Sequence, residues 1–210
     1  MCSTNKYLKL LTCLLFIFST SITLAQPERY LAGRDYQLIE APSSSNALGI
    51  VEVEEYFWYG CPGCFQFDFI LTDWLETLPQ EVNFTRFPAI WSAQHEVHAK
   101  AYYTAFQLGV LESLHEKIFE AMHLEGLRFR NESELAGFFE KNNISNEQFT
   151  SAYNSFTVNT AINRAEKKAR DYLVRNTPSM VVNGKYIVNL RADTLEIVDF
   201  LIRKELTIND

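Results

Sequence analysis

The sequence predicts an α/β fold into which a helical domain is inserted. Apolar runs typical of strands occupy residues 50–59 and 82–87, on either side of a segment with helical spacing. Residues 89–176 have helical patterning almost throughout, and residues 177–188 have the pattern of a β-hairpin. Because 47% of the 210 residues are hydrophobic and 14% are aromatic, the chain can bury a sizeable core and we do not expect disorder.

The first 25 residues are typical of a secretory signal peptide. Lys6 and Lys9 supply positive charge, residues 10–22 form a short apolar run, and residues 23–25 are typical of a cleavage site. The apolar run is shorter than the roughly 20 residues that a membrane span needs. We therefore expect export and cleavage after Ala25.

Removal of this segment changes the charge and the cysteine content. The net charge of −7 becomes −9, because two lysines leave and no acid does. Of the four cysteines, only Cys61 and Cys64 remain. An acidic protein is a poor partner for nucleic acid. An exported chain of this size with one close cysteine pair is not stabilised by disulfides in the ordinary way, so the pair indicates reactivity or ligand binding.

The exported part begins with a predicted edge strand at residues 36–39 and a loop at residues 42–46. The strand at residues 50–59 follows, and its alternation places Glu55 on the same face as Val51, Val53 and Phe57. The simple alternative is that this end of the strand is exposed to solvent and Glu55 is a surface acid. An acid among apolar side chains, just before two thiols, favours a buried carboxylate whose pKa is raised by desolvation.

The motif Cys61-Pro62-Gly63-Cys64 connects this strand to the next helix. The free N–H groups and the dipole at a helix N-terminus favour ionisation of the first thiol, and proline suits the first turn. A structural disulfide and half of a metal site are the alternatives. Closing so short a loop stabilises a fold by only about 2 kcal/mol, so the motif favours redox chemistry.

The helix after the motif is predicted from Phe67, Leu71, Trp74 and Leu78, which recur at helical spacing, and is expected to end near Pro79. The second strand follows at residues 82–87.

The inserted helical domain is expected to pack its apolar stripes into a core. Asn131 with Glu134, and Ser145 with Gln148, resemble the boxes that start helices. The basic run of Arg164, Lys167, Lys168 and Arg170 is expected to be a solvated face. The expected core residues are Val97, Ala101, Ala105, Leu108, Leu111, Leu114, Ile118, Met122, Leu135, Phe138, Phe139, Phe149, Ala152, Tyr153, Phe156, Val158, Ile162, Ala165, Ala169 and Leu173.

His95 and His98 lie three residues apart on a predicted helix, a spacing that metal sites use. No third ligand is evident nearby in the sequence. We therefore predict solvated or hydrogen-bonded histidines and no metal site.

The chain ends with a hairpin and a helix. Asn183-Gly184 is predicted to form a two-residue turn between strands at residues 177–182 and 185–188, and a helix is expected to start near Asp193. The complete order is that of a thioredoxin-like fold with a helical insertion. Its two parts would be residues 26–88 and 177–210, on either side of the inserted domain at residues 89–176.

Two stretches resemble the DsbA family of periplasmic thiol:disulfide interchange proteins. They are residues 55–64, EYFWYGCPGC, and residues 177–186, TPSMVVNGKY, and the helical segment between them has the family's length. The resemblance implies a periplasmic protein that needs no metal or dissociable cofactor. We expect a monomer, because no N-terminal dimerisation segment is visible.

The resemblance also implies roles for individual residues. Cys61 would be the exposed nucleophile and Cys64 the buried resolving thiol. Glu55 would be the buried acid that assists proton movement. Pro178 would be the loop proline whose peptide bond is cis and which faces the disulfide.

Three further residues are expected to contact substrate: Pro62, Gly63 and Thr177. Two of them depart from the commonest family pattern, since many members have histidine in place of Gly63 and many oxidases have an apolar β-branched residue in place of Thr177. Both departures bear on how strongly the pair oxidises.

Together these observations predict an oxidase that introduces disulfide bonds into reduced exported proteins by dithiol–disulfide exchange. By resemblance, a quinone-linked membrane partner of the DsbB type would reoxidise it. The alternatives are a reductase or isomerase of the same superfamily and, from another class, a thiolate metal carrier. The missing third ligand and the proline beside the thiols disfavour the carrier.

Overall fold

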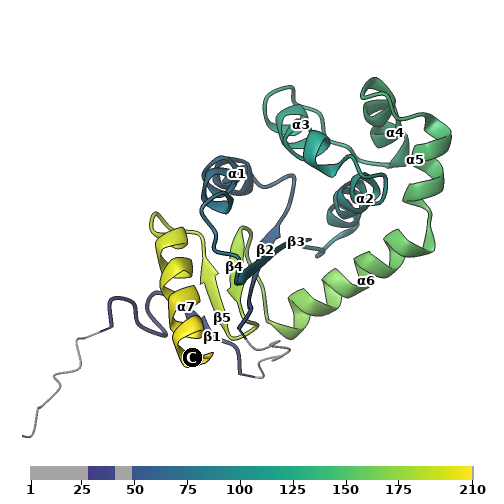
Figure 1. Ribbon diagram of the computed structural model, residues 1–210. Helices are drawn as coiled ribbons and strands as arrows, with labels where there is room; N and C mark the ends of the chain where they lie inside the picture. Colours follow the sequence, from purple (N-terminus) through teal and green to yellow (C-terminus); the bar gives the residue numbers. More distant parts are fainter. Residues whose placement is uncertain (1–27, 41–48, 210) are drawn as a thin grey trace, which may run out of the picture.

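The computed structural model describes residues 28–40 and 49–209. The predicted signal peptide and the loop at residues 42–46 lie outside these ranges. A five-stranded sheet lies between two helices on one side and a block of helices on the other (Figure 1). This is the predicted α/β architecture with a helical insertion, and the fold class is confirmed.

The element order follows the expected one. The strands are β1 Gln37–Leu38, β2 Val51–Phe57, β3 Val82–Pro88, β4 Ser179–Val182 and β5 Tyr186–Asn189. The helices are α1 Pro62–Leu75, α2 Ala93–Gln107, α3 Leu111–His123, α4 Glu132–Lys141, α5 Asn146–Tyr153, α6 Phe156–Asp171 and α7 Thr194–Asn209. The division of the chain into domains at residues 89 and 177 stays a prediction. Within the described ranges, no helix has the length and apolar character needed to cross a membrane.

The strand order in the sheet is β1-β5-β4-β2-β3, so β1 is at one edge as predicted. Only the β2–β3 pair is parallel. Asn183 and Gly184 both have positive φ, of 51° and 60°, which suits the asparagine–glycine turn. Pairing resumes at Tyr186 opposite Val182, so Lys185 lies in the connection rather than in the strand.

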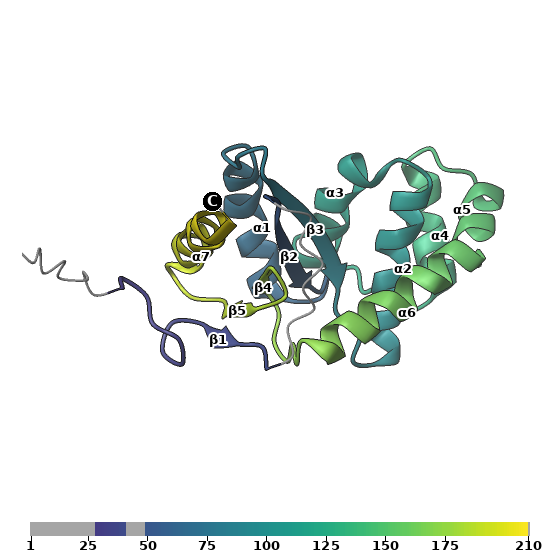
Figure 2. The same ribbon diagram turned by 60° about the horizontal axis from the view of Figure 1, so that its bottom comes forward.

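Each face of the sheet has its own core. On one face, α1 and α7 pack against β2, β4 and β5 through a cluster that includes Phe67, Leu71 and Val198. On the other face, the C-terminal half of α6 packs through Ala165 and Ala169. Figure 2 shows the two sets of helices on opposite sides of the sheet. Both faces of β2 are therefore covered, which buries Glu54 as well as Glu55.

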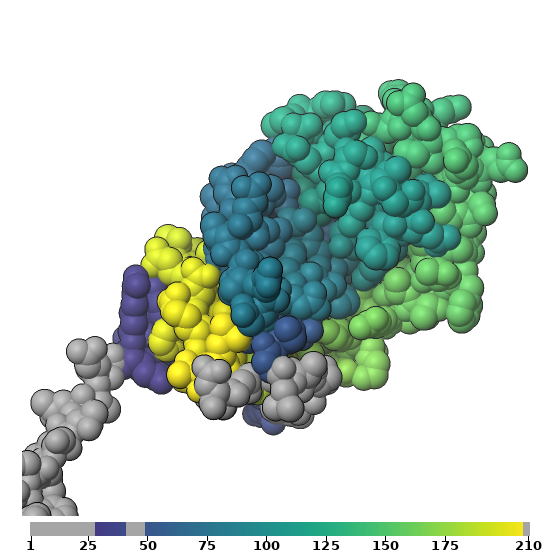
Figure 3. All heavy atoms as spheres, viewed as in Figure 1, coloured from purple at the N-terminus to yellow at the C-terminus, as the bar shows by residue number. Residues whose placement is uncertain are grey.

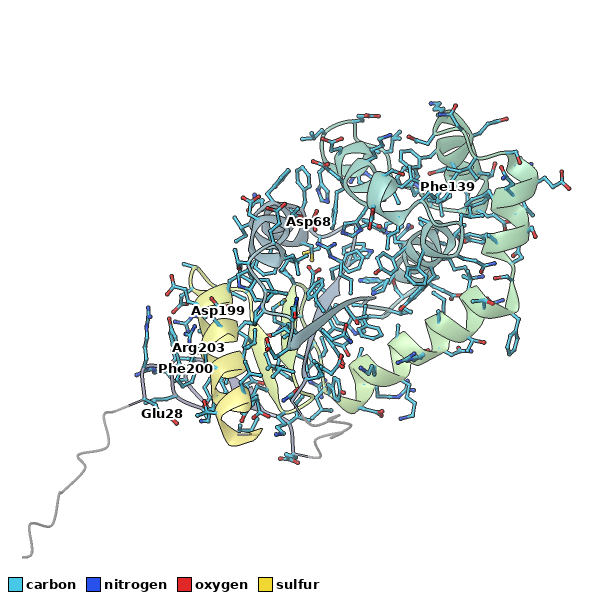
Figure 4. All side chains as sticks on the ribbon, in the orientation of Figure 1. Glu28, Asp68, Phe139, Asp199, Phe200 and Arg203 are labelled. Atoms are coloured by element: carbon cyan, nitrogen blue, oxygen red, sulfur yellow. The ribbon has the colours of Figure 1, made fainter. Side chains whose placement is uncertain are left out.

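The helical block has a separate aromatic core, in which Phe139 is fully buried (Figure 4). This core also contains Phe57, Tyr59 and Cys64 from the sheet side. In the space-filling view the surface of α1 continues into that of the helical block (Figure 3). The second cysteine of the motif is thus buried where the two parts of the protein meet.

Helix capping explains two wrong core predictions. Phe156 is 85% exposed, because Ser155 accepts a hydrogen bond from Val158 N–H and starts α6 anew, which turns Phe156 outward. Leu173 is 57% exposed at a φ of 56°, just beyond the end of α6. The N–H of Val174 bonds to the carbonyl of Ala169 at 2.9 Å, and Val174 takes the buried position.

Two further expectations are corrected. The helix α1 ends at Leu75, before Leu78, because the Thr77 hydroxyl bonds to the carbonyl of Trp74 at 2.7 Å. Lys168 is not part of a solvated face. Its ammonium group pairs with the buried Glu54 carboxylate and lies 4.7 Å from the centre of the Phe87 ring.

Candidate active site at the first turn of α1

The cysteine motif lies where β2 turns into α1. The N–H of Cys61 bonds to the carbonyl of Trp58 at 2.9 Å, and Cys61 then caps the helix with an extended backbone. A side chain at Gly60 would place its Cβ 2.3 Å from the Trp58 ring, so only glycine fits this turn. Pro62 occupies the first helical position, as expected.

Cys61 is a partly exposed thiol at the helix N-terminus. Its Sγ accepts from the N–H of Cys64 at 3.4 Å and lies 3.3 Å from the carbonyl oxygen of Thr177. The Cys64 thiol has the largest effect on its pKa, burial opposes that effect, and the Thr177 hydroxyl and the N–H groups of Cys64 and Gly63 add to it. Together they lower the pKa of Cys61 to about 5. Cys61 is therefore a thiolate at neutral pH.

Cys64 has the opposite environment. Its side chain is fully buried in the aromatic core. Burial raises the pKa of Cys64 strongly, and its hydrogen bond to Cys61, the charge on Cys61 and the charge on Glu55 raise it further. Cys64 thus stays protonated while Cys61 is ionised.

The loop before β4 lies against the motif. The Thr177–Pro178 peptide bond is cis, as the family pattern implied. A Cβ at Gly63 would lie 3.5 Å from Pro178 Cδ, 3.7 Å from Cys61 Sγ and 3.2 Å from Leu190 Cδ2. Of the expected substrate-contact residues, Thr177 and Gly63 therefore lie beside the Cys61 sulfur and Pro62 directly follows Cys61, while Leu190 lies beside Gly63.

Glu55 lies in the interior beneath this turn. It is 1% exposed, which confirms the expected burial. Its cross-strand neighbour in the parallel pair is Arg86, whose Nε donates to Glu55 Oε2 at 2.9 Å. Burial raises the pKa of Glu55 from 4.5 to about 7, against the opposing charge of Arg86 and with the support of the Asp68 charge. Glu55 therefore exchanges a proton near neutral pH.

Arg86 is shared between two acids. Its Nη2 donates to Asp68 Oδ1 at 2.7 Å, while its Nε bonds to Glu55. Asp68 lies on the side of α1 that faces the helical block (Figure 4). Neither Asp68 nor Arg86 was among the site residues predicted from the sequence. Asp68 follows the core residue Phe67 on α1, and Arg86 has the same parity as Phe84 on β3, so a charge in an apolar pattern was the available signal.

The histidine pair has other partners than a metal. His95 stacks on Trp58 with the ring centres 4.2 Å apart, and His98 Nε2 lies 3.0 Å from the carbonyl oxygen of Arg128. In the part of the chain that the structure describes, no three His, Cys, Asp or Glu side chains converge as a metal site requires.

Comparison with known proteins places the whole chain beside one family. The sequence model of the DSBA-like thioredoxin domain matches residues 80–197. The thiol:disulfide interchange protein DsbA of Pseudomonas aeruginosa is 36% identical over 201 residues, which cover 93% of this chain and 95% of the relative. The DsbA of Azotobacter vinelandii is 35% identical over 198 residues, covering 91% and 92% of the two chains.

Solved structures show the same likeness. The crystal structure of Pseudomonas aeruginosa DsbA superposes with a TM-score of 0.81 at 36% identity, covering 85% of this chain and 96% of that one. The oxidoreductase DsbA from Xylella fastidiosa superposes with a TM-score of 0.79 at 34% identity, covering 84% and 97%.

Proposed function

The chain belongs to the DsbA family and is a thiol:disulfide oxidoreductase, and from this premise we propose that it introduces disulfide bonds into reduced exported proteins through Cys61 and Cys64. The observation that carries the proposal is the contrast between the two thiols. Cys61 is partly exposed with a pKa of about 5, whereas Cys64 is buried with a raised pKa. A pair of this kind is attacked at its outer sulfur and favours the reduced form.

The first step forms a mixed disulfide. A thiolate of the substrate attacks Cys61 Sγ in the oxidised enzyme, a bond forms between these two sulfurs, and the Cys61–Cys64 bond breaks. Cys64 leaves with the electron pair and takes up a proton. Glu55 is the proposed donor, because its pKa of about 7 leaves it partly protonated at neutral pH and its charge acts on Cys64.

The second step releases the product. A second thiolate of the substrate attacks the substrate sulfur of the mixed disulfide, and Cys61 leaves as a thiolate that its neighbours stabilise. The substrate has lost two electrons and two protons, and the enzyme has gained two electrons. Thr177, Pro178, Pro62 and Gly63 are proposed to hold the substrate chain beside Cys61, since Thr177 and Gly63 lie beside its sulfur, Pro178 lies beside Gly63 and Pro62 directly follows Cys61.

The enzyme must then be reoxidised by an acceptor of two electrons. We propose a quinone-linked membrane protein of the DsbB type, a periplasmic location after cleavage near Ala25, and a monomeric state. Support for these three proposals comes from the family membership and from the sequence features described above.

The direction of the reaction is tested in two assays. Oxidised enzyme is expected to oxidise a reduced two-cysteine peptide stoichiometrically, and alkylation in intact cells is expected to find Cys61 and Cys64 mostly as a disulfide. A pair that is mostly reduced in cells, with insulin reduction but no peptide oxidation, would instead assign a reductase. A titration of reduced enzyme with Cu(I) tests the metal carrier, which requires submicromolar binding without either activity.

A further inference from the structure

The buried polar network beneath the thiols continues beyond Asp68 to a histidine. Asp68 Oδ1, which accepts from Arg86, also lies 3.4 Å from Nε2 of His115 on α3. The other ring nitrogen of His115, Nδ1, lies 2.8 Å from the hydroxyl of Tyr59. His115 is 7% exposed and Tyr59 is 1% exposed. The mechanism above uses neither residue.

The partners of His115 fix which nitrogen carries its proton. A carboxylate only accepts hydrogen bonds, so the nitrogen that faces Asp68 is the one with hydrogen. In the neutral ring Nδ1 then accepts, and the Tyr59 hydroxyl donates to it. At 3.4 Å the contact with Asp68 is an electrostatic contact and not a full hydrogen bond, and Nε2 has no hydrogen-bond partner among the described residues. The Nε2–H group of His115 is thus buried, and the polar group that it faces is the Asp68 carboxylate.

The surroundings of His115 keep it neutral. Its ring lies 5.2 Å from the centres of the Phe57 and Phe119 rings and 5.9 Å from that of Tyr102. Burial lowers the pKa of His115 most, the charge of Arg86 lowers it further, and Asp68 opposes both.

The charged and titratable groups that face His115 come from every neighbouring element. They are Tyr59 after β2, Asp68 on α1, Arg86 on β3, Tyr102 on α2, and Glu116 beside it on α3. Of these groups, only Arg86 also directs N–H groups at Asp68. The charge balance at Asp68 is therefore set by two donors, and one of these also serves Glu55.

We propose that His115 is a positioning residue for the proton transfer at Cys64: by directing its Nε2–H dipole at Asp68, 3.4 Å away, it leaves Arg86 available to Glu55, and it thereby sets the proton affinity of Glu55. This inference rests on the proposed role of Glu55 as proton donor and acceptor for Cys64. When the His115 donor is removed, Arg86 is drawn toward Asp68 and its 2.9 Å bond to Glu55 weakens. A carboxylate that loses its cation holds its proton more tightly, so Glu55 would titrate at higher pH.

The test is the pH dependence of reoxidation of reduced enzyme by oxidised glutathione, in which Cys64 must lose a proton before it resolves the mixed disulfide. In His115→Phe, which keeps a ring of similar size, we expect the midpoint of the profile to move up by roughly half a pH unit, near the lower limit for one lost hydrogen bond because the contact with Asp68 is weaker than a full one. In His115→Gln, whose amide can still donate to Asp68, we expect the wild-type midpoint. The control is His98→Phe, a buried histidine outside the network, which is expected to leave the midpoint unchanged.

Two outcomes overturn the inference: an unchanged midpoint in folded His115→Phe, or the same shift in His98→Phe. If His115→Phe does not fold, His115→Leu takes its place, because it also removes the N–H group that faces Asp68. An unchanged midpoint there also overturns it. Glu55→Gln in the same assay distinguishes a failure of the proposed role of Glu55 from a failure of the proposed role of His115. If its profile matches wild type, the proposed role of Glu55 fails; if it differs while His115→Phe does not, only the role of His115 fails.

Discussion

The two thiols of the motif lie three residues apart in one turn of helix, yet their environments drive them in opposite directions. Cys61 is at the helix N-terminus, where the Cys64 thiol, the Thr177 hydroxyl and two N–H groups bring its pKa to about 5. Cys64 is one turn deeper in an aromatic core, where burial and the charges of Cys61 and Glu55 raise its pKa. Position along the first turn therefore separates an ionised thiol from a protonated one.

This difference in pKa gives the two sulfurs different roles in exchange. The outer sulfur is a good leaving group because its thiolate is stable, and the inner sulfur needs a proton donor because its thiolate is not. Glu55, buried on β2, is the proposed donor, because its own pKa of about 7 lets it exchange a proton near neutrality. The predictions below alter one side of the contrast at a time.

The largest effect is expected from deleting each thiol in turn. Cys61→Ala should lose all exchange above the rate without enzyme, because the buried Cys64 cannot be reached by substrate. Cys64→Ala should still react at Cys61 and accumulate a mixed disulfide that it cannot resolve. Mass spectrometry of each variant after incubation with oxidised glutathione checks this. Adduct formation by Cys61→Ala at the rate of Cys64→Ala would contradict the assignment.

The next largest effect concerns the pH dependence of stability. The pKa of Glu55 is raised to about 7, so folding favours its protonated form, and the stability from this group is present below its unfolded pKa and lost as pH rises through about 7. Between pH 5 and pH 8 this loss is roughly 2–3 kcal/mol. Glu55→Gln should remove it, giving a flatter dependence of unfolding free energy on pH in urea titrations. A parallel dependence in wild type and variant would mean that Glu55 is not a buried acid.

A smaller effect is expected at Gly63. A histidine there adds a positive charge or a donor near the Cys61 thiolate, so Gly63→His should lower the pKa of Cys61 and make the pair more oxidising, by at most about 30 mV for each pKa unit. The new Cβ would meet Leu190 Cδ2 at 3.2 Å, but Leu190 is 46% exposed and free to turn away.

Gly63→Ala is the matched control, since it adds the Cβ without the imidazole. A glutathione redox titration beside a titration of thiolate absorbance measures both quantities. An unchanged or more reducing potential in folded Gly63→His would show that the dipeptide between the cysteines does not set the redox poise.

The smallest effect is expected at Thr177. Its hydroxyl helps to stabilise the Cys61 thiolate, so Thr177→Val should raise the pKa of Cys61 and make the pair less oxidising. One neutral donor is worth less than about one pKa unit, or 30 mV. Thr177→Ser keeps the hydroxyl and should resemble wild type. Equal reduction potentials in Thr177→Val and Thr177→Ser would show that the Thr177 hydroxyl does not stabilise the thiolate.

Much of the contrast was predictable because it depends on local pattern. The motif at a strand–helix junction predicts an ionised first thiol, and strand parity predicts a buried Glu55. The hairpin follows from Asn183-Gly184, whose positive φ values only a few residue types adopt.

The remainder depends on packing between elements that are distant in sequence. Arg86 reaches Glu55 because the register of β2 against β3 makes them neighbours, and no local pattern states that register. Lys168 is half-buried against Glu54 because α6 lies on the second face of the sheet. Phe156 and Leu173 were wrongly predicted to be core residues, because the caps at the two ends of α6 interrupt the helical periodicity on which that prediction was based.

The most direct test of the contrast is the rate of alkylation of each thiol as a function of pH, in reduced enzyme, followed residue by residue by mass spectrometry. We predict that Cys61 reacts with a midpoint near pH 5, as its lowered pKa requires, and that Cys64 stays almost unreactive up to pH 9. Equal rates for the two thiols at pH 6, or a Cys61 midpoint near the free-cysteine value of about 8.5, would contradict the account.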